Sequence, residues 1–507
     1  MNPDDKRKFG LILILLLPTV FWFQAVKRTE VLNPPKWKAV YELIKITHER
    51  PVLLASAIGG LVLAILLIWL MNQLGQSEFS GAYFRKFLRG TRIASKAKLI
   101  RQTRENKAQQ IDVGGVPMPR KIENLHVLVN GATGSGKSVL LRALAWSGLR
   151  RRDKFIFVDP NGDMLSKFYK EGDAILNPYD ARTKGWTFFN EIRNDYDFER
   201  YALSIVPRGR SEEAEEWAGY ARLLLRETAR KLQLMGKPSM RELFRWTTIA
   251  QPKELKQFLE GTVAESLFVG ADKALASARF VLSDKLPQHL NMPPGDFSLR
   301  AWLDNPEGGN LYITWREDMA EALKPLISAW VDVLCTSILS LSENETRRLW
   351  MMIDELASLE KLASLEAALT KGRKHGLRIV AGLQSSTQLD DIYGEKEAQT
   401  LRACFRSLVV LGGAKTDPKT CEDMSKSLGE HEVERDKYSK TSGYKSSTNK
   451  NEERNKERVV MPSEIASLPD LTGYVAFAGD YPIAKVKLEP LSFKNRVSSI
   501  EERAIYA

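Results

Sequence analysis

The sequence has 507 residues, enough for two or three domains, and its 43% hydrophobic and 27% charged residues are globular on average. Three widely spaced cysteines without a CxxC pair exclude a disulfide framework and a cysteine-rich zinc site. The net charge of +12 favours an anionic partner such as nucleic acid or lipid headgroups, although an ordinary solvated surface also carries such a charge.

Two apolar stretches near the start, residues 9–26 and 51–71, are long enough to cross a bilayer. Basic residues before the first stretch also suit a signal peptide, but no typical cleavage site follows and a second stretch comes soon after. We therefore predict an uncleaved transmembrane hairpin over residues 1–71 with a loop at 27–50. Apolar spacing at 37–44 predicts a short amphipathic helix on the far membrane surface.

Residues 72–111 are a basic connector with a helical pattern. A cationic face near anionic lipid is the favoured interpretation of its charge, and a DNA contact is the alternative.

A glycine-rich segment fits the pattern G-x-x-x-x-G-K-[ST], with Gly131, Gly136, Lys137 and Ser138 at its fixed positions. A β-branched apolar run precedes it and a helix-forming run follows, which is the context that a phosphate-binding loop needs. Backbone N–H groups and the helix N-terminus would surround phosphate oxygens, while Lys137 reaches the β/γ-phosphates of ATP and Ser138 reaches Mg²⁺. The residues expected to contact the nucleotide are Gly131, Ala132, Thr133, Gly134, Ser135, Gly136, Lys137, Ser138 and Val139.

The nucleotide site also predicts the orientation of the hairpin. Basic residues are about equally numerous on its two sides, so they do not decide the orientation. Because nucleotide is cytoplasmic, both termini and residues 72–507 are expected in the cytoplasm.

Residues 112–190 continue as strand, phosphate loop, helix and strand. The second strand ends at Asp159, for which a site carboxylate and a turn-forming aspartate stay equally open. In residues 191–297 strand patterns give way to helix signals, including a capping box at Ser239-x-x-Glu242. We predict an all-α domain over residues 191–297.

From residue 298 onward, apolar runs alternate with helical patterns, which predicts a parallel sheet buried on both faces. The nucleotide-binding domain is therefore expected to comprise residues 112–190 and 298–507, with a hairpin near its end. Residues 436–458 are polar without apolar periodicity, so a mobile loop and an extended solvated ribbon both stay open. The expected strands are 311–315, 349–354, 377–381, 407–411, 474–477 and 484–487.

A hydrophobic strand ending in Asp354 and Glu355 supplies the second half of an ATPase site. Asp354 is expected to support Mg²⁺, and Glu355 to deprotonate the attacking water. Gln384 ends a neighbouring strand and is a candidate sensor of the γ-phosphate. Arg373, in the loop before that strand, is the candidate for a transition-state cation supplied across a subunit interface, although spacing hardly separates it from Lys374 or Arg378.

Together these features resemble the conjugative type IV secretion coupling proteins. The resemblance covers essentially the whole chain, and its specific parts are residues 131–138, 158–162, 177–180, 353–355 and 372–384. It implies an α/β fold: a RecA-like P-loop motor domain with an inserted all-α domain and an N-terminal two-helix transmembrane hairpin. It further implies a homo-hexameric ring with ATP sites at subunit interfaces, DNA passing through a central channel, and contacts with relaxosome proteins and components of the secretion channel.

The leading hypothesis is therefore a multi-pass ATPase of the bacterial inner membrane that pumps single-stranded DNA during conjugation, binding it without sequence preference. A coupling ATPase that translocates proteins is the first alternative, because its motor would be identical. A DNA translocase of the FtsK type ranks last, because only about twenty residues follow the expected terminal hairpin, too few for a further DNA-reading domain.

Overall fold

The computed structural model describes residues 3–29, 41, 44–45, 47–75, 86–106, 108–268, 272–441 and 447–504. The chain divides into two compact units. The first comprises Met1–Leu88 and Glu432–Asn455, and the second comprises Arg89–His431 and Lys456–Ala507.

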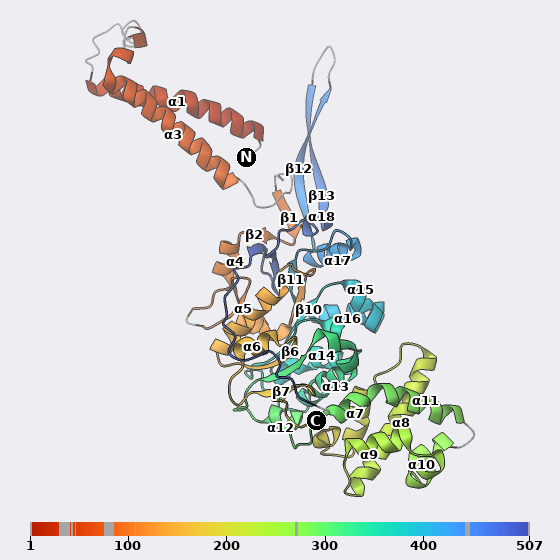
Figure 1. Cartoon of the computed structure of the whole chain (residues 1–507). Helices are drawn as coiled ribbons and strands as arrows, with labels where there is room; N and C mark the ends of the chain where they lie inside the picture. The colour runs from red at the N-terminus through yellow and green to blue at the C-terminus, as the bar shows by residue number, and fades with distance from the viewer. Residues whose placement is uncertain are drawn as a thin grey trace. The chain divides into compact units, whose positions relative to one another are not determined.

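In the first unit, two long apolar helices pack side by side, α1 (Pro3–Thr29) and α3 (Pro51–Gly75) (Figure 1). Gly60 allows the close approach, because a Cβ at this position would lie 2.7 Å from the carbonyl oxygen of Leu17. Both helices are long and apolar enough to cross a membrane, over Phe9–Thr29 and Pro51–Leu70. Most of the amphipathic helix predicted between them lies outside the described residues.

The polar segment near residue 440 is an extended ribbon, one of the two interpretations that the sequence left open. Its strands are β12 (Glu430–Thr441) and β13 (Ser447–Arg458), and β1 (Lys86–Gly90) completes a three-stranded sheet in the order β1-β12-β13. The helical pattern predicted for the whole connector is therefore wrong over β1 and β2 (Ile93–Ala94), where pairing with strands far away in sequence overrides local propensity. A helix does follow, α4 (Lys96–Thr103).

The second unit is built on a ten-stranded sheet in the order β2-β15-β14-β11-β5-β10-β9-β6-β8-β7. The seven strands from β11 to β7 are parallel, as predicted, whereas β14 and β15 form the expected antiparallel hairpin beside β11. The strand bounds are β5 Val127–Asn130, β6 Lys154–Pro160, β7 Ala174–Leu176, β8 Leu311–Trp315, β9 Leu349–Ile353, β10 Leu377–Leu383, β11 Ser407–Leu411, β14 Thr472–Ala476 and β15 Ile483–Lys487. A small antiparallel hairpin, β3 (Ile111–Val113) and β4 (Val116–Met118), precedes β5.

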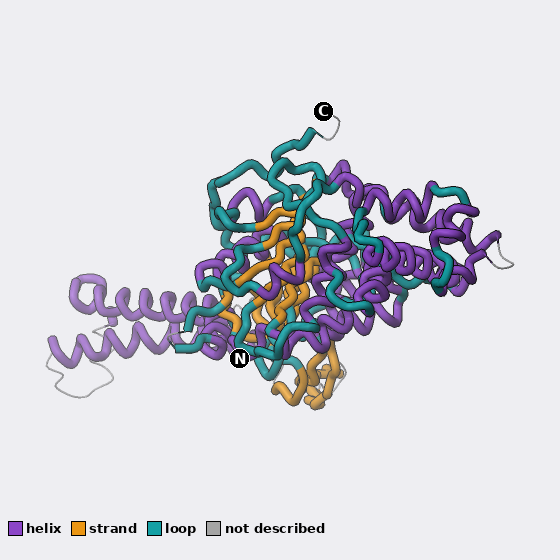
Figure 2. Tube along the Cα trace, turned by 90° about the horizontal axis from the view of Figure 1, so that it is seen from below, coloured by secondary structure: helices purple, strands orange, loops and turns teal. Residues whose placement is uncertain are grey.

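Helices cover both faces of this sheet (Figure 2). Alternation along β5 sends Val127 and Val129 into one hydrophobic core and Leu128 into the other. The first core contains α5 (Lys137–Arg150) and α6 (Asp163–Phe168), and the second contains α13, α14 and α16. The helices that follow β8 in the chain are α13 Ala320–Ile338, α14 Leu365–Lys371, α15 Ser386–Tyr393, α16 Glu395–Cys404, α17 Pro418–Leu428 and α18 Pro462–Ile465.

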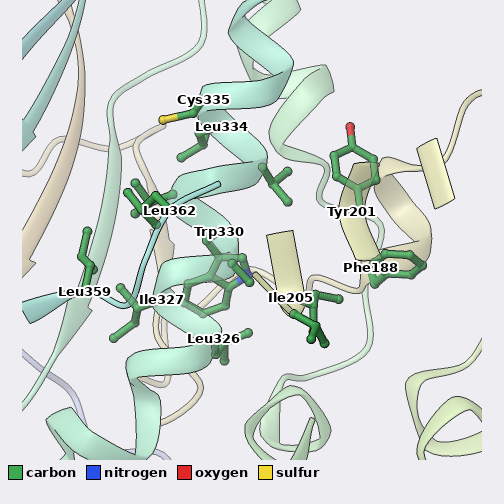
Figure 3. Packing of buried hydrophobic residues seen from close by; sticks show 14 of the residues in the cluster. Phe188, Tyr201, Ile205, Leu326, Ile327, Trp330, Leu334, Cys335, Leu359 and Leu362 are labelled. Atoms are coloured by element: carbon green, nitrogen blue, oxygen red, sulfur yellow. The ribbon is translucent and has the colours of Figure 1, made fainter. Parts of the chain in front are cut away.

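Between residues 191 and 297 the described residues form helices and no strand, as the sequence predicts. Figure 3 shows how this segment meets the sheet core: Tyr201 and Ile205 of α7 lie beside Trp330 and its neighbours on α13. Because one continuous core joins the segment to the sheet, the exact bounds of an all-α domain remain a prediction. Its helices are α7 Tyr196–Ile205, α8 Glu212–Leu234, α9 Met240–Phe244, α10 Pro252–Phe258 and α11 Asp272–Lys285, and α12 Leu299–Asp304 follows.

His289 generates a prediction about stability. It is buried next to Trp186, with 5.9 Å between the ring centroids, and neither ring nitrogen has a hydrogen-bond partner among the described residues. Burial lowers the pKa of His289 to about 4. Because that pKa lies below its unfolded value of about 6.5, the folded state resists protonation, and stability present above pH 6.5 is lost as the pH falls toward 4.

Between pH 7 and pH 5, protonation of His289 is expected to cost the wild type about 2 kcal/mol of stability. We expect His289→Leu to be free of this pH-dependent loss. The measurement is the melting temperature of the full chain at both pH values. His48→Leu, at a side chain that is 74% exposed, is the matched control and should melt like the wild type at each pH. An unchanged pH dependence in His289→Leu would contradict the assignment.

Candidate nucleotide site

Parallel strand pairing brings the predicted site residues to one edge of the sheet. Strand β10 lies between β5 and β9, and the Cα pairs Leu383–Asn130 and Ala381–Ile353 fix the register. The phosphate loop after β5, the acidic pair after β9 and Gln384 after β10 therefore leave the same edge as neighbours. Carboxyl ends of parallel strands are where α/β proteins bind ligands.

The phosphate loop has the backbone conformation that its sequence predicts. Gly134 and Gly136 have φ values of +81° and +112°, a region that side-chain-bearing residues rarely adopt. Helix α5 begins directly after Gly136, so its first N–H groups point into the loop. The Ala132 N–H donates to Gly412 O at 2.8 Å and the Leu471 N–H donates to Ser135 O at 3.1 Å, which anchors the loop to the strands beside it.

Lys137 and Glu355 form an ion pair across this edge, with 3.1 Å between Lys137 Nζ and Glu355 Oε2. Both side chains are largely buried, 10% and 15% exposed, so the pair is screened weakly by solvent. Glu355 Oε1 and Asp354 Oδ1 are buried without a hydrogen-bond partner in the described part of the chain. These oxygens retain the capacity to accept a proton or to ligate a cation.

The surroundings of Asp354 shift its pKa. Burial raises the pKa of the Asp354 carboxyl, the positive charge of Lys137 opposes this rise, and the negative charge of Glu355 adds to it. A divalent cation bound to the carboxylates would offset the cost of burying their negative charge, as a proton does. The donor set of a hydroxyl at Ser138 and a carboxylate at Asp354 fits Mg²⁺, which prefers oxygen ligands.

Gln384 is held by the phosphate loop itself. Its Oε1 accepts a hydrogen bond from Thr133 Oγ1 at 2.8 Å. That bond uses the acceptor of the amide and leaves its NH₂ donors for another partner. A terminal phosphate in the loop would be such a partner.

A cleft of about 300 Å³ lies between these groups, as large as the smaller ligand-binding pockets of proteins. It is lined by Ala132, Thr133, Gly134, Gly136, Lys137, Ser138, Val139, Asp354, Glu355, Gln384 and Leu471. All but one of these residues are predicted from the sequence. The exception, Leu471, has a φ of +59°, a strained conformation of the kind that clusters at functional sites, and no local sequence signal indicates it.

Arg373 does not join this cleft. It lies in the 3₁₀ turn Gly372–His375 before β10, whereas Gln384 follows the same strand. Seven strand residues separate the two ends by about 23 Å, so Arg373 lies at the opposite edge of the sheet.

The structure also separates Arg373 from the two competing cations. Lys374 pairs with Glu343, and Arg378 is buried against Glu123, with 3.1 Å between Arg378 Nε and Glu123 Oε2. The Arg373 side chain is exposed and has no ion-pair or hydrogen-bond partner among the described residues. It is therefore the one of the three whose side chain has no partner among the described residues, whereas Lys374 is paired but 52% exposed.

Of the two roles that the sequence leaves open for Asp159, the structure shows that of a turn-forming aspartate. Its carboxylate accepts the backbone N–H groups of Met164 at 3.0 Å and Leu165 at 2.8 Å, so it caps the first turn of α6. Burial raises the pKa of Asp159 to about 7, and the negative charge of Asp163 adds to the rise. The turn is completed by Gly162, at which a Cβ would lie 2.5 Å from the carbonyl oxygen of Ser499.

Comparison with known proteins adds to this geometry. A family model described as the type IV secretion-system coupling protein DNA-binding domain matches residues 110–489. Coupling protein TraD of Escherichia coli (strain K12) is 32% identical over 410 residues, which are 76% of this chain and 55% of TraD, so the chain spans about half of that relative.

Solved structures of a related protein are similar over most of the chain. The unbound monoclinic form of the bacterial conjugative coupling protein TrwBdeltaN70 superposes with a TM-score of 0.81 and 70% identity, covering 85% of this chain and 99% of that one. Plasmid coupling protein TrwB in complex with ADP and Mg²⁺ gives a TM-score of 0.80 and 69% identity, with 84% and 100% covered. The predicted RecA-like α/β class with a helical insertion is confirmed, and the two apolar N-terminal helices are present.

Proposed function

Because the chain belongs to the family of type IV secretion-system coupling proteins, we propose that it is an ATPase of the bacterial inner membrane that pumps single-stranded DNA during conjugation. The observation that carries the ATPase assignment is the buried Lys137–Glu355 pair beside the phosphate loop. A basic chain and a family model named for DNA binding support DNA as the cargo.

ATP and Mg²⁺ are the ligands that fit the site. The related TrwB structure contains ADP and Mg²⁺, and the phosphate loop of this chain has the same residue types that bind phosphate elsewhere. Residues 131–139 hold the phosphates, and Ser138 and Asp354 hold the cation. Mg²⁺, when bound, neutralises charge on the phosphates.

The chain's own groups then perform hydrolysis. Lys137 exchanges Glu355 for the β/γ-phosphate oxygens, which frees Oε2 of Glu355. Glu355 orients the attacking water and takes its proton, using an acceptor that the buried site leaves unpaired. Gln384 donates its amide N–H groups to the terminal phosphate and thereby distinguishes ATP from ADP.

Arg373 acts in another copy of the chain. Its position at the far edge of the sheet prevents it from reaching the phosphate loop of its own copy, while its exposure leaves it free to reach a neighbour. A homo-hexameric ring with sites between copies places each Arg373 beside the next cleft. There it stabilises the charge that develops on the transferred phosphoryl group.

The remaining parts serve transport. The helices α1 and α3 anchor the ring in the membrane as a two-span hairpin, and the motor domain lies in the cytoplasm. The all-α domain of residues 191–297 and the basic connector of residues 72–111 complete the chain. Relaxosome proteins and components of the secretion channel are the proposed protein partners.

Glu355→Gln is expected to bind ATP and fail to hydrolyse it, because glutamine keeps the size of the side chain and loses the base. We expect turnover to fall by at least about 100-fold, the lower range for general base catalysis. Phosphate release and binding of a fluorescent ATP analogue are the two measurements. Lys137→Thr should lose both activities, and normal turnover in Glu355→Gln would refute its role.

Arg373→Ala is expected to lose hydrolysis by about 10³-fold, the lower range for a cation supplied in trans. Mixing it with Lys137→Thr should restore part of the activity, since intact sites then meet an intact Arg373. Lys374→Ala is the matched control in the same turn and should keep the wild-type rate. Failure of every mixing ratio to restore activity would refute action between copies.

A further inference from the structure

A second cleft lies in the second unit, at the edge of the sheet opposite the nucleotide site. It has a volume of about 480 Å³ and is bounded by the amino ends of β6 and β9 and by the loops before them. Five cationic side chains line it, namely Arg151, Arg152, Lys154, Arg347 and Arg348. This basic cleft contains no predicted site residue.

Carboxylates balance only part of this charge. Arg151 is paired with Glu123 at 2.6 Å and with Asp153, and Arg348 reaches Asp153 only at 3.6 Å. The other acid in the lining, Asp304, pairs with Arg193 at 2.8 Å. Three of the cations have no carboxylate partner in the described part of the chain: Arg152, Lys154 and Arg347.

Basic residues at helix C-termini are common, and this explains the charge near the end of α5 at Arg150. It does not explain Arg347 and Arg348, which immediately precede strand β9. The φ of +65° at Arg152 belongs to the C-terminal cap of α5, in which the Arg152 N–H donates to Leu149 O at 3.1 Å and the Asp153 N–H donates to Gly148 O at 3.0 Å. The Arg152 side chain is exposed and has no hydrogen-bond or ion-pair partner among the described residues, so its charge is available to a ligand.

We propose that this basic cleft binds the sugar–phosphate backbone of single-stranded DNA, an inference that rests on the proposed function. Two cations of its lining are accessible, Arg152, which is exposed, and Arg348, which is 34% exposed. Accessible cations of this kind neutralise the successive phosphates of a single strand. Lys154 lies deeper, bound to the carbonyl oxygens of Trp302 and Asn305 at 2.7 and 2.6 Å.

The wall of the cleft is joined to the turn that carries Arg373. Arg347 Nη1 donates to His375 O at 2.9 Å, and the Asn344 N–H donates to Lys374 O at 2.7 Å. From strand β10, which follows the turn, Arg378 Nη1 donates to Arg347 O at 2.5 Å. DNA in the cleft therefore contacts a loop that holds the Arg373 turn in place, which gives DNA a route to stimulate hydrolysis in the neighbouring copy.

The test uses the full chain in detergent and a labelled oligothymidine, with affinity followed by fluorescence anisotropy over a salt series. The variants are Arg152→Asn, in which asparagine tolerates the left-handed backbone, and Arg152→Asn combined with Arg348→Gln. Lys253→Asn, an exposed charge on α10, is the matched control. Unchanged ATP affinity and unstimulated ATP hydrolysis establish that each variant is folded.

We expect the double variant to bind about tenfold more weakly and its salt slope to fall by about 0.7 for each phosphate that the variant no longer neutralises. Stimulation of hydrolysis by DNA should fall with it, while Lys253→Asn behaves as the wild type. Wild-type affinity, slope and stimulation in the double variant would overturn the inference and leave the proposed function intact.

Calorimetry with inorganic pyrophosphate, on protein whose nucleotide site is already filled with ADP and Mg²⁺, distinguishes DNA from a small phosphate ligand as the occupant of the basic cleft. Retained pyrophosphate binding in the double variant supports the assignment to DNA. Loss of pyrophosphate binding with retained DNA binding would overturn it, because the cleft would then hold a small phosphate ligand. A wild-type chain that does not bind the oligonucleotide would overturn both this inference and the proposed cargo.

Discussion

The parallel register of β5, β10 and β9 is the constraint on which the site depends. It brings together Lys137 and Glu355, which are 218 residues apart in the sequence, and buries their ion pair at the carboxyl edge of the sheet. Gly382 permits this packing, because a Cβ there would overlap the carbonyl oxygen of Asp354. A slip of the register by one residue would turn every side chain of β10 to the other face and separate the acidic pair from the loop.

The same strands give the domain two edges with different charges. Acidic and phosphate-binding groups share the carboxyl edge, while Arg373 and the basic cleft occupy the amino edge. A buried network ties the amino ends together: Glu123 accepts from both Arg151 and Arg378, and Asp153 accepts from Arg151 and from Trp350 Nε1 at 2.8 Å. Removing one partner of such a network leaves an uncompensated buried charge, so the turn before β10 has little freedom to drift.

Local sequence predicts the parts of the molecule that depend on backbone conformation and on runs of apolar residues. Glycines at 134 and 136 are required by positive φ, and continuous apolar runs become buried parallel strands with bounds close to those expected. Strand pairing between distant segments is invisible at that level, and β1 and β2 are strands only because β12 and β15 pair with them. Leu471 is not predicted from local sequence for the same reason, because its place beside Ser135 depends on the terminal hairpin.

Asp159 and Arg373 mark the limits of prediction at the site. A strand-end aspartate beside a phosphate loop has two plausible roles by sequence, and only the N–H groups of α6 decide between them. For the three cations near residue 373, the structure shows that Lys374 pairs with Glu343 and that Arg378 is buried against Glu123. Neither distinction is available from spacing, because both depend on partners far away in the chain.

The measurement that tests the account most directly is the ATPase rate of the full chain with and without single-stranded DNA, over a series of salt and protein concentrations. The account predicts strong stimulation that fades with salt and rises steeply with protein concentration, since phosphate contacts are electrostatic and each site needs two copies. A rate indifferent to DNA at every salt and protein concentration would contradict a DNA motor and favour protein as the cargo.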